Sequence, residues 1–155
     1  MSTRACYVFK DENNTFTVYK HWDGYPEGAA SFFVNAIPYA WDLPRFDAMD
    51  FAAAFIAGNK TKGGDVYITT KPEDHSDIDY VYELIQAKNG QLIIKAFETE
   101  YVNSVNDYDT PESATRYKEI FYGRLKGFVS RYGDDYTKKE WDALDKSDNK
   151  LYKVA

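Results

Sequence analysis

The chain contains one cysteine, Cys6, among 155 residues. A lone cysteine excludes a disulfide within the chain, and it has no partner at the spacing of a zinc site. Because Cys6 lies in an apolar run, we interpret it as a small buried hydrophobic residue rather than a nucleophile. The N-terminal stretch MSTRACYVFK lacks the apolar core of a signal peptide, and no segment approaches the roughly 20 apolar residues of a membrane span. We therefore expect a cytoplasmic protein, or one kept in a reducing compartment, without membrane contact.

Basic residues are outnumbered, since 19 Lys and Arg stand against 25 Asp and Glu, for a net charge of −6. Binding to nucleic acid depends on Lys and Arg that replace the counterions of phosphates, so direct nucleic-acid binding is not expected. The excess of acids suits a protein that docks on a basic surface. Acids spread along a chain also confer solubility, and that simpler interpretation stays open.

The common catalytic signatures are missing as well. The sequence has no Gly-x-Ser-x-Gly, no P-loop and no dinucleotide-binding fingerprint. Nucleophilic hydrolases and nucleotide hydrolases are therefore without support, and we predict no cofactor.

Aromatic residues are abundant, with 14 Tyr, 10 Phe and 3 Trp making up 17% of the chain. Phenylalanine can fill a core, but so many tyrosines cannot all be buried with their hydroxyls hydrogen-bonded. We expect some of them to be half-exposed, where they provide contact surface for a partner or a planar ligand.

Runs rich in β-branched and aromatic residues, bounded by turn formers, predict six strands, over residues 4–10, 15–21, 66–70, 78–86, 92–98 and 115–123. The turn formers DENN join the first two strands as a hairpin, and Asn89-Gly90 joins the fourth and fifth. The spacing of the later strands predicts an antiparallel meander that begins with 66–70. The tract 99–113 is predicted to be a loop.

Helical patterns occupy residues 29–37, 45–59, 124–133 and 137–146. Pro38 is expected to end the first helix. The second is apolar nearly all round, as in a helix that crosses a sheet, with Pro44 suited to its first position and Gly58 to its C-terminal cap. Thr137-x-x-Glu140 has the pattern of a capping box. The predicted fold is one α+β domain, residues 1–155, with a mainly antiparallel sheet, two central helices on one face and short C-terminal helices.

Both histidines of the chain occur as His-x-Asp, at His21–Asp23 and His75–Asp77. In extended backbone, residues i and i+2 project to the same side. Two such pairs brought together would form an N₂O₂ set able to hold zinc or iron. The order His21, Asp23, His75 also fits an iron site, but that site needs a sizeable β-barrel and the helices leave too few strands. We therefore predict no metal.

The stretch HWDGYPEG, residues 21–28, combines polar and aromatic groups with a turn. Asp23-Gly24 favours a turn and Tyr25-Pro26 favours extended backbone, so the stretch can be pure scaffold. The alternative is a loop that carries Trp22 and Tyr25 to the start of a helix, whose free amides attract anions.

Two further features are weaker candidates. Arg45 is the only base between His21 and Ala57, and it suits either an anion clamp or an ion pair with a nearby acid. The run 73–79, EDHSDID, is a solvated loop or an acidic patch that meets a partner. The candidate ligand- or partner-binding residues are His21, Trp22, Asp23, Tyr25, Arg45, Asp74, His75 and Asp77.

Three segments, VYKHWDGYPEGAA, AWDLPRF and FAAAFIAGNK, resemble a group of small uncharacterised proteins of bacteria and their phages. The resemblance covers about the first 100 residues and carries no activity. It implies a compact cytoplasmic protein of phage or prophage type. The residues that match the shared pattern are His21, Asp23, Gly24, Tyr25, Pro26, Gly28, Pro44 and Arg45.

We therefore expect a non-enzymatic binding protein, one by which a phage engages or inhibits a host component with a basic surface. In that view the loop 73–79 and exposed tyrosines form the contact. The alternative is a small enzyme, or a protein that binds a nucleotide-like ligand, with a pocket lined by His21, Asp23, Tyr25 and Arg45. A third hypothesis is a subunit of a larger assembly or a homo-oligomer.

Overall fold

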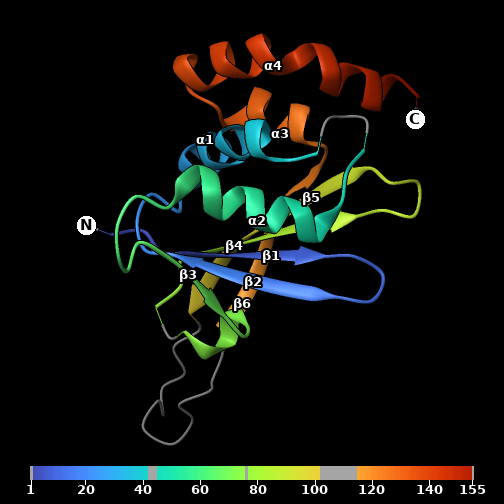
Figure 1. Ribbon diagram of the computed structural model, residues 1–155. Helices are drawn as coiled ribbons and strands as arrows, with labels where there is room; N and C mark the ends of the chain where they lie inside the picture. The colour runs from blue at the N-terminus through green and yellow to red at the C-terminus, as the bar shows by residue number, and fades with distance from the viewer. Residues whose placement is uncertain (1, 42–44, 76, 102–114, 155) are drawn as a thin grey trace, which may run out of the picture.

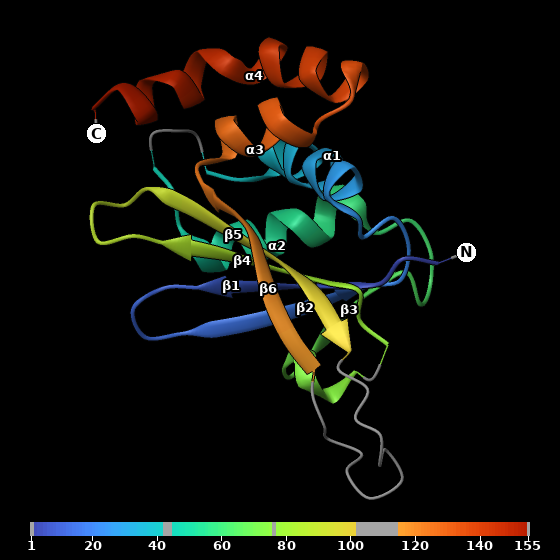
Figure 2. The same ribbon diagram turned by 180° about the vertical axis from the view of Figure 1, so that it is seen from behind.

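The computed structural model describes residues 2–41, 45–75, 77–101 and 115–154. Its strands form one mixed sheet of six strands in the order β3-β2-β1-β4-β5-β6 (Figures 1 and 2). The strands are β1 (Ala5–Lys10), β2 (Thr15–Lys20), β3 (Val66–Thr69), β4 (Tyr80–Gln86), β5 (Leu92–Tyr101) and β6 (Thr115–Gly123). The predicted order of strands and helices is confirmed.

The hairpin β1–β2 and the antiparallel succession β4-β5-β6 form as predicted. Gly90 in the β4–β5 turn has a φ of 81°, which explains the Asn-Gly dipeptide. The meander was predicted to begin one strand earlier, and that is wrong. Strand β3 pairs antiparallel with β2 at the edge of the sheet, and β4 pairs in parallel with β1.

Exposure explains why β3 and β4 are separated. The short strand β3 leaves Tyr67 and Ile68 exposed, as an edge strand can. In β4, by contrast, Tyr82 and Leu84 are fully buried, so this strand suits the middle of the sheet. Although β3 and β4 are consecutive along the chain, they therefore lie three positions apart in the sheet.

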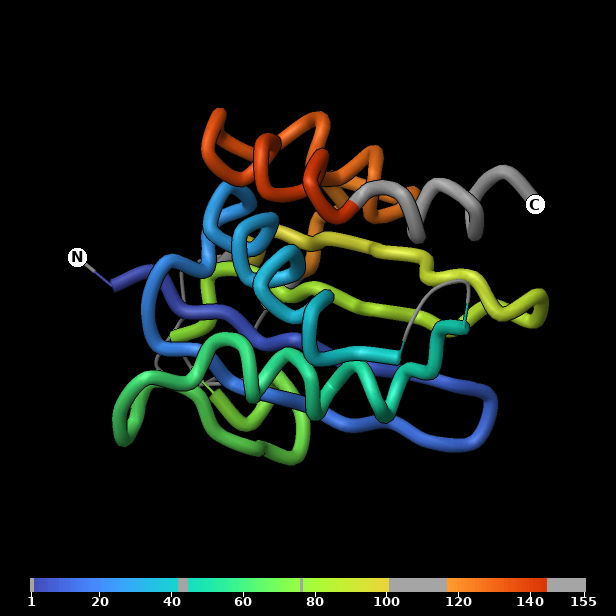
Figure 3. The backbone as a smooth tube through the Cα atoms, turned by 45° about the horizontal axis from the view of Figure 1, so that its top comes forward, coloured from blue at the N-terminus to red at the C-terminus, as the bar shows by residue number. Residues whose placement is uncertain are grey.

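Four helices pack on the same face of the sheet (Figures 1 and 3). They are α1 (Pro26–Ala36), α2 (Ala48–Asn59), α3 (Leu125–Tyr132) and α4 (Asp135–Val154), with 3₁₀ turns η1 (Ile37–Tyr39) and η2 (Pro72–Asp74). Helix α2 lies against β1 to β4 and α3 against β5 and β6, α1 packs beside both of these helices, and α4 forms the outermost layer (Figure 1). The prediction that two central helices cover one face is confirmed.

Aromatic residues fill the space between helices and sheet. The ring of Tyr7 on β1 lies 5.8 Å from that of Phe33 on α1, 4.5 Å from that of Phe55 on α2 and 5.1 Å from that of Tyr82 on β4, centroid to centroid. All four side chains are fully buried. The core thus takes up most phenylalanines and a minority of the tyrosines.

Two predicted details of α2 need correction. Pro44, expected at the first helical position, lies outside the described residues, and the helix begins at Ala48. Its N-cap is Asp47, whose Oδ1 accepts a hydrogen bond from the Asp50 amide at 2.9 Å. Gly58 does not cap the helix. A Cβ there would lie 2.4 Å from the Asn35 carbonyl oxygen, so this glycine allows α1 and α2 to approach closely.

The C-terminal region also differs from the prediction. Asp134, rather than Thr137, caps α4, because its Oδ1 accepts a hydrogen bond from the Thr137 amide at 2.7 Å. Helix α3 is short, with 8 residues, but α4 has 20. Strand β5 runs on to Tyr101, into the predicted loop, and residues 102–113 of that loop lie outside the described residues. None of the described helices combines the length and apolarity needed to cross a bilayer.

Candidate functional site

The stretch 21–28 is a turn, fixed by backbone hydrogen bonds, that joins β2 to α1. The His21 amide donates to the Asp65 carbonyl at 2.9 Å, and the Gly24 amide donates to the Thr3 carbonyl at 2.9 Å. Asp23 has a φ of 57°, a left-handed conformation that aspartate tolerates better than most residues. The first bond ties the turn to the residue before β3, and the second ties it to the residues before β1.

Both glycines of this turn are required by close packing. A Cβ at Gly24 would lie 2.7 Å from the Ala5 Cβ, and one at Gly28 would lie 1.9 Å from the Asp23 carbonyl oxygen. The buried Tyr82 hydroxyl donates to the Gly24 carbonyl at 2.6 Å. Pro26 occupies the first turn of α1 after the N-cap Tyr25. The glycines and the proline therefore serve as scaffold.

The side chains of the same turn divide into two groups. Asp23 and Tyr25 are exposed and interact with each other, because the Tyr25 hydroxyl donates to Asp23 Oδ1 at 3.4 Å. The charge of Asp23 raises the pKa of Tyr25. His21 and Trp22 are half-buried, with their rings 5.0 Å apart, and Lys62 Nζ lies 4.6 Å from the Trp22 ring centroid.

Both histidines contact Tyr19, a residue that was not predicted from the sequence. His21 Nδ1 lies 2.8 Å from the Tyr19 hydroxyl oxygen. The His75 ring stacks on the Tyr19 ring with centroids 4.5 Å apart, and its Nε2 lies 2.8 Å from Thr69 Oγ1. The alternation of β2, which aims residues 19 and 21 to one side, was the available signal for half of this contact.

The aspartates of the two motifs do not join the histidines in a metal site. Asp77 Oδ2 lies 3.2 Å from Arg4 Nε, while Asp23 faces Tyr25. Across the described ranges no three His, Cys, Asp or Glu side chains are grouped so that they could hold a metal ion. The two His-x-Asp motifs thus provide an imidazole pair on a tyrosine, and their carboxylates serve elsewhere.

Arg45 lies at the other end of the molecule. Its guanidinium carbon is 4.1 Å from the Trp41 ring centroid. It precedes α2, whose first amide, that of Ala48, donates to Gln86 Oε1 at the end of β4. His21 lies near the opposite end of that helix, which is about 18 Å long at 1.5 Å per residue. The pocket predicted to contain both His21 and Arg45 is therefore not formed.

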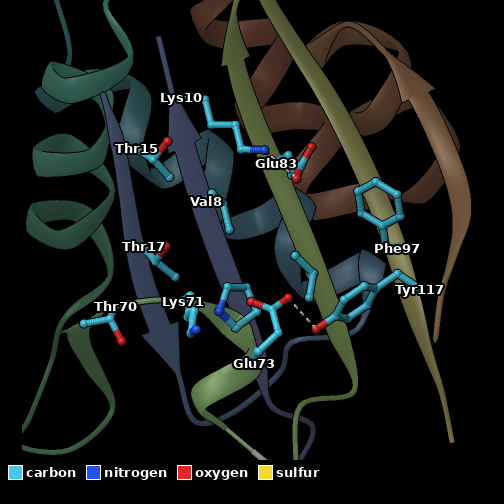
Figure 4. A pocket seen from close by; sticks show the side chains of 12 residues that line it. Val8, Lys10, Thr15, Thr17, Thr70, Lys71, Glu73, Glu83, Phe97 and Tyr117 are labelled. Atoms are coloured by element: carbon cyan, nitrogen blue, oxygen red, sulfur yellow. Dashed lines mark hydrogen bonds and ion pairs between the residues drawn. The ribbon is translucent and has the colours of Figure 1, made fainter. Parts of the chain in front are cut away.

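The face of the sheet opposite the helices carries a hollow. We call this side, which presents Cys6, Val8 and Lys10 of β1, the uncovered face, because none of the four described α-helices packs on it, although η2 borders it. The hollow has a volume of about 290 Å³ and is bounded by the strands and by η2 (Figure 4). Val8 and Val81 lie in its apolar part, Thr15 and Thr17 of β2 line one side, and Phe97 and Tyr117 line the other.

Two polar contacts mark the ends of the hollow. At one end Lys10 Nζ lies 2.8 Å from Glu83 Oε2, an ion pair across β1 and β4. At the other end the Tyr117 hydroxyl donates to Glu73 Oε2 at 3.1 Å (Figure 4). Glu73 and its neighbour Asp74 are exposed on η2. Asp74 was predicted from the sequence, but Lys10, Glu83 and Tyr117 were not, since isolated polar residues in strands are typical of any solvent-facing side.

The Cys6 thiol and the Tyr19 phenol, which would be nucleophiles if ionised, are neutral at pH 7. Cys6 is fully buried, and its burial, with smaller contributions from the charges of Glu73 and Asp77, raises the pKa of its thiol to about 12. Burial also raises the pKa of Tyr19. A neutral thiol and a neutral phenol are poor nucleophiles.

The chain matches no protein-family model, no curated protein and no solved structure. The phage-type context therefore remains a prediction from the sequence segments that carry it.

Proposed function

We propose that this is a non-enzymatic binding protein whose uncovered face engages a protein partner with a basic surface. The observation that carries the proposal is the one-sided packing of the molecule. All four described helices lie on one face of the sheet, while the other face holds an open hollow with polar and aromatic sides.

Exposed aromatic residues support this choice of surface. Tyr67 on β3 is 43% exposed and Tyr122 on β6 is 61% exposed. Both belong to the uncovered face, because Tyr67 is paired with Tyr19 and Tyr122 with Lys95, which in turn lies opposite Glu83. Tyrosine is enriched at protein interfaces, where its ring is buried and its hydroxyl finds a partner.

Charge supports a basic partner. The chain has a net charge of −6, and the segment that borders the hollow carries Glu73, Asp74 and Asp77 close together. Complementary charge speeds the encounter of two proteins and orients it. For a protein of phage type, the partner would be a host component that it engages or inhibits.

The proposal is tested by site-specific photo-cross-linking in bacterial lysate. A cross-linking phenylalanine analogue replaces Tyr122 or Tyr67, and, as a control, Tyr39. The control is well matched, since Tyr39 is also 61% exposed but follows α1 on the helix-covered side. We expect a discrete cross-linked product from Tyr122 and Tyr67, absent from Tyr39 and reduced at high salt.

Three other results would overturn the proposal. The first is equal labelling from Tyr39 and Tyr122, which would indicate nonspecific contact. The second is a product from Tyr39 alone, which would move the interface to the helices. The third is a product of twice the chain mass, which would favour the homo-oligomer.

A further inference from the structure

We propose that the hollow of the uncovered face receives one basic side chain of the partner, an arginine, held between the carboxylate of Glu73 and the rings of Phe97 and Tyr117. This inference rests on the proposed function and specifies which group of the partner is recognised. It concerns the η2 end of the hollow, where the acidic and aromatic residues meet (Figure 4).

Glu73 is placed to act as the acceptor. The Tyr117 hydroxyl, which donates to Oε2 at 3.1 Å, holds the carboxylate against the aromatic side of the hollow. Within the residues that the structure describes, Glu73 forms no ion pair, in contrast to Glu83 at the opposite end, which is paired with Lys10 at 2.8 Å. A basic group arriving at Glu73 therefore has no described ion pair to displace there.

The neighbouring rings suit a guanidinium group in particular. The rings of Phe97 and Tyr117 lie 6.4 Å apart, centroid to centroid, at an interplanar angle of 65°, so they present a face and an edge side by side. A guanidinium is planar and weakly hydrated, and it stacks on aromatic faces while forking two N–H donors onto a carboxylate. The buried side chains of Val8 and Val81 provide apolar surface for the methylenes of the same side chain.

The local charge favours a cation over an anion. Lys10 is neutralised by Glu83, and Arg4 by Asp77 at 3.2 Å. At the η2 end, Lys71 and Glu73 both line the hollow, and the exposed Asp74 follows Glu73 on η2. At this end the carboxylates of Glu73 and Asp74 outnumber the single ammonium of Lys71, so a guanidinium is favoured over an anion. The volume, about 290 Å³, also suits one side chain better than a larger ligand.

The test uses Nα-acetyl-arginine methylamide as the probe and follows backbone amide shifts of the full chain by NMR. The matched control is the citrulline analogue, which has nearly the same shape and no charge. We expect saturable shifts at Val8, Val81, Phe97 and Tyr117 with the arginine compound and none with the citrulline compound. Glu73→Gln should weaken binding by about tenfold, because a charge-assisted pair is lost.

Glu12→Gln is the control variant, since Glu12 is exposed in the β1–β2 turn and makes the same change of charge away from the hollow. It should leave the affinity within about twofold. Thermal unfolding of both variants should match that of the parent chain, which separates lost recognition from lost fold.

The inference is overturned by equal binding of the two compounds, by unchanged affinity in Glu73→Gln, or by shifts at the same amides with inorganic phosphate. Each of these can occur while Tyr122 still cross-links a partner, and the proposed function would then stand without the arginine. Conversely, if the arginine compound binds but no partner is cross-linked, the cation site is supported and the proposed function is overturned.

Discussion

The two faces of the sheet are made by the same strands but differ in what they present. Along β1, Ala5, Tyr7 and Phe9 point to the helices and are all fully buried. The intervening residues Cys6 and Val8 belong to a second, smaller cluster with Tyr19, Ile78 and Val81, on which none of the four described α-helices packs. Lys10 then ends the strand beside Glu83. The face under the helices is thus part of a closed aromatic core, and the uncovered face has a small apolar cluster with polar residues at its ends.

This difference indicates that the two faces contribute unequally to stability. Burial of apolar area is the main source of folding free energy, and most of it lies between helices and sheet. The uncovered face contributes less, so it is free to carry charge, threonines and exposed rings. We expect substitutions on the two faces to separate stability from binding, and the largest difference comes from the aromatic residues.

Phe55→Ala should lower the free energy of unfolding by about 3–5 kcal/mol, because a fully buried ring is lost from the centre of the covered core. Phe97→Ala, on the uncovered face, should lower it by only about 1–2 kcal/mol, since this ring is half-buried. Urea denaturation followed by circular dichroism measures both. Equal losses would mean that the uncovered face is packed as tightly as the core, and the comparison would fail.

Two buried tyrosines of the covered face should respond in opposite ways. Tyr82→Phe leaves the Gly24 carbonyl without its hydrogen bond and should lower stability by about 1–3 kcal/mol. The Tyr7 hydroxyl is buried and has no hydrogen-bond partner among the described residues. Tyr7→Phe should therefore leave stability unchanged or raise it by up to about 1 kcal/mol. The same denaturation experiment applies, and a loss from Tyr7→Phe comparable to that from Tyr82→Phe would contradict the assignment of these hydroxyls.

The smallest expected effect concerns Cys6 and alkaline pH. Its pKa rises from an ordinary 9.0 to about 12 in the folded chain. Between these values the unfolded chain releases a proton that the folded chain keeps, so stability falls as pH rises. From about pH 9 to about pH 10 the thiol should contribute a loss of about 1 kcal/mol.

Cys6→Ala is the matched variant for this pH dependence. It should be less stable at every pH because of its cavity, but the thiol's part of the alkaline decline should vanish. Buried tyrosines titrate in both chains, so the difference between the two curves isolates the cysteine. Parallel curves would show that the thiol of the folded chain ionises normally.

Local patterns in the sequence were sufficient to predict most elements. The turn formers around residues 11–14 and Asn89-Gly90 mark hairpins that the structure contains. The apolar character of residues 45–59 correctly predicted a helix lying on a sheet, and the helix occupies Ala48–Asn59. Such signals are local, because a turn or a helix face depends on residues within a few positions of one another.

Pairings over long distances were not predictable in the same way. The residues around Tyr80 contain no local signal that β4 pairs in parallel with β1. The prediction that β4 pairs with β3 was wrong for that reason. The contact of His21 and His75 with Tyr19 depends on that arrangement, as does the hollow. Arg45 shows the converse, since it is nearer to His21 in the sequence than His75 is but lies at the other end of α2.

By itself the sequence determined the kind and order of the elements, the aromatic core and the acid excess, because these follow from composition and short-range periodicity. Only the tertiary structure decided that the glycines and proline of residues 21–28 are scaffold, that two histidines share one tyrosine, and that a hollow opens beside Glu73. Those features arise where strands distant in the chain become neighbours, and the choice of neighbour is made by packing of the whole sheet rather than by any one segment.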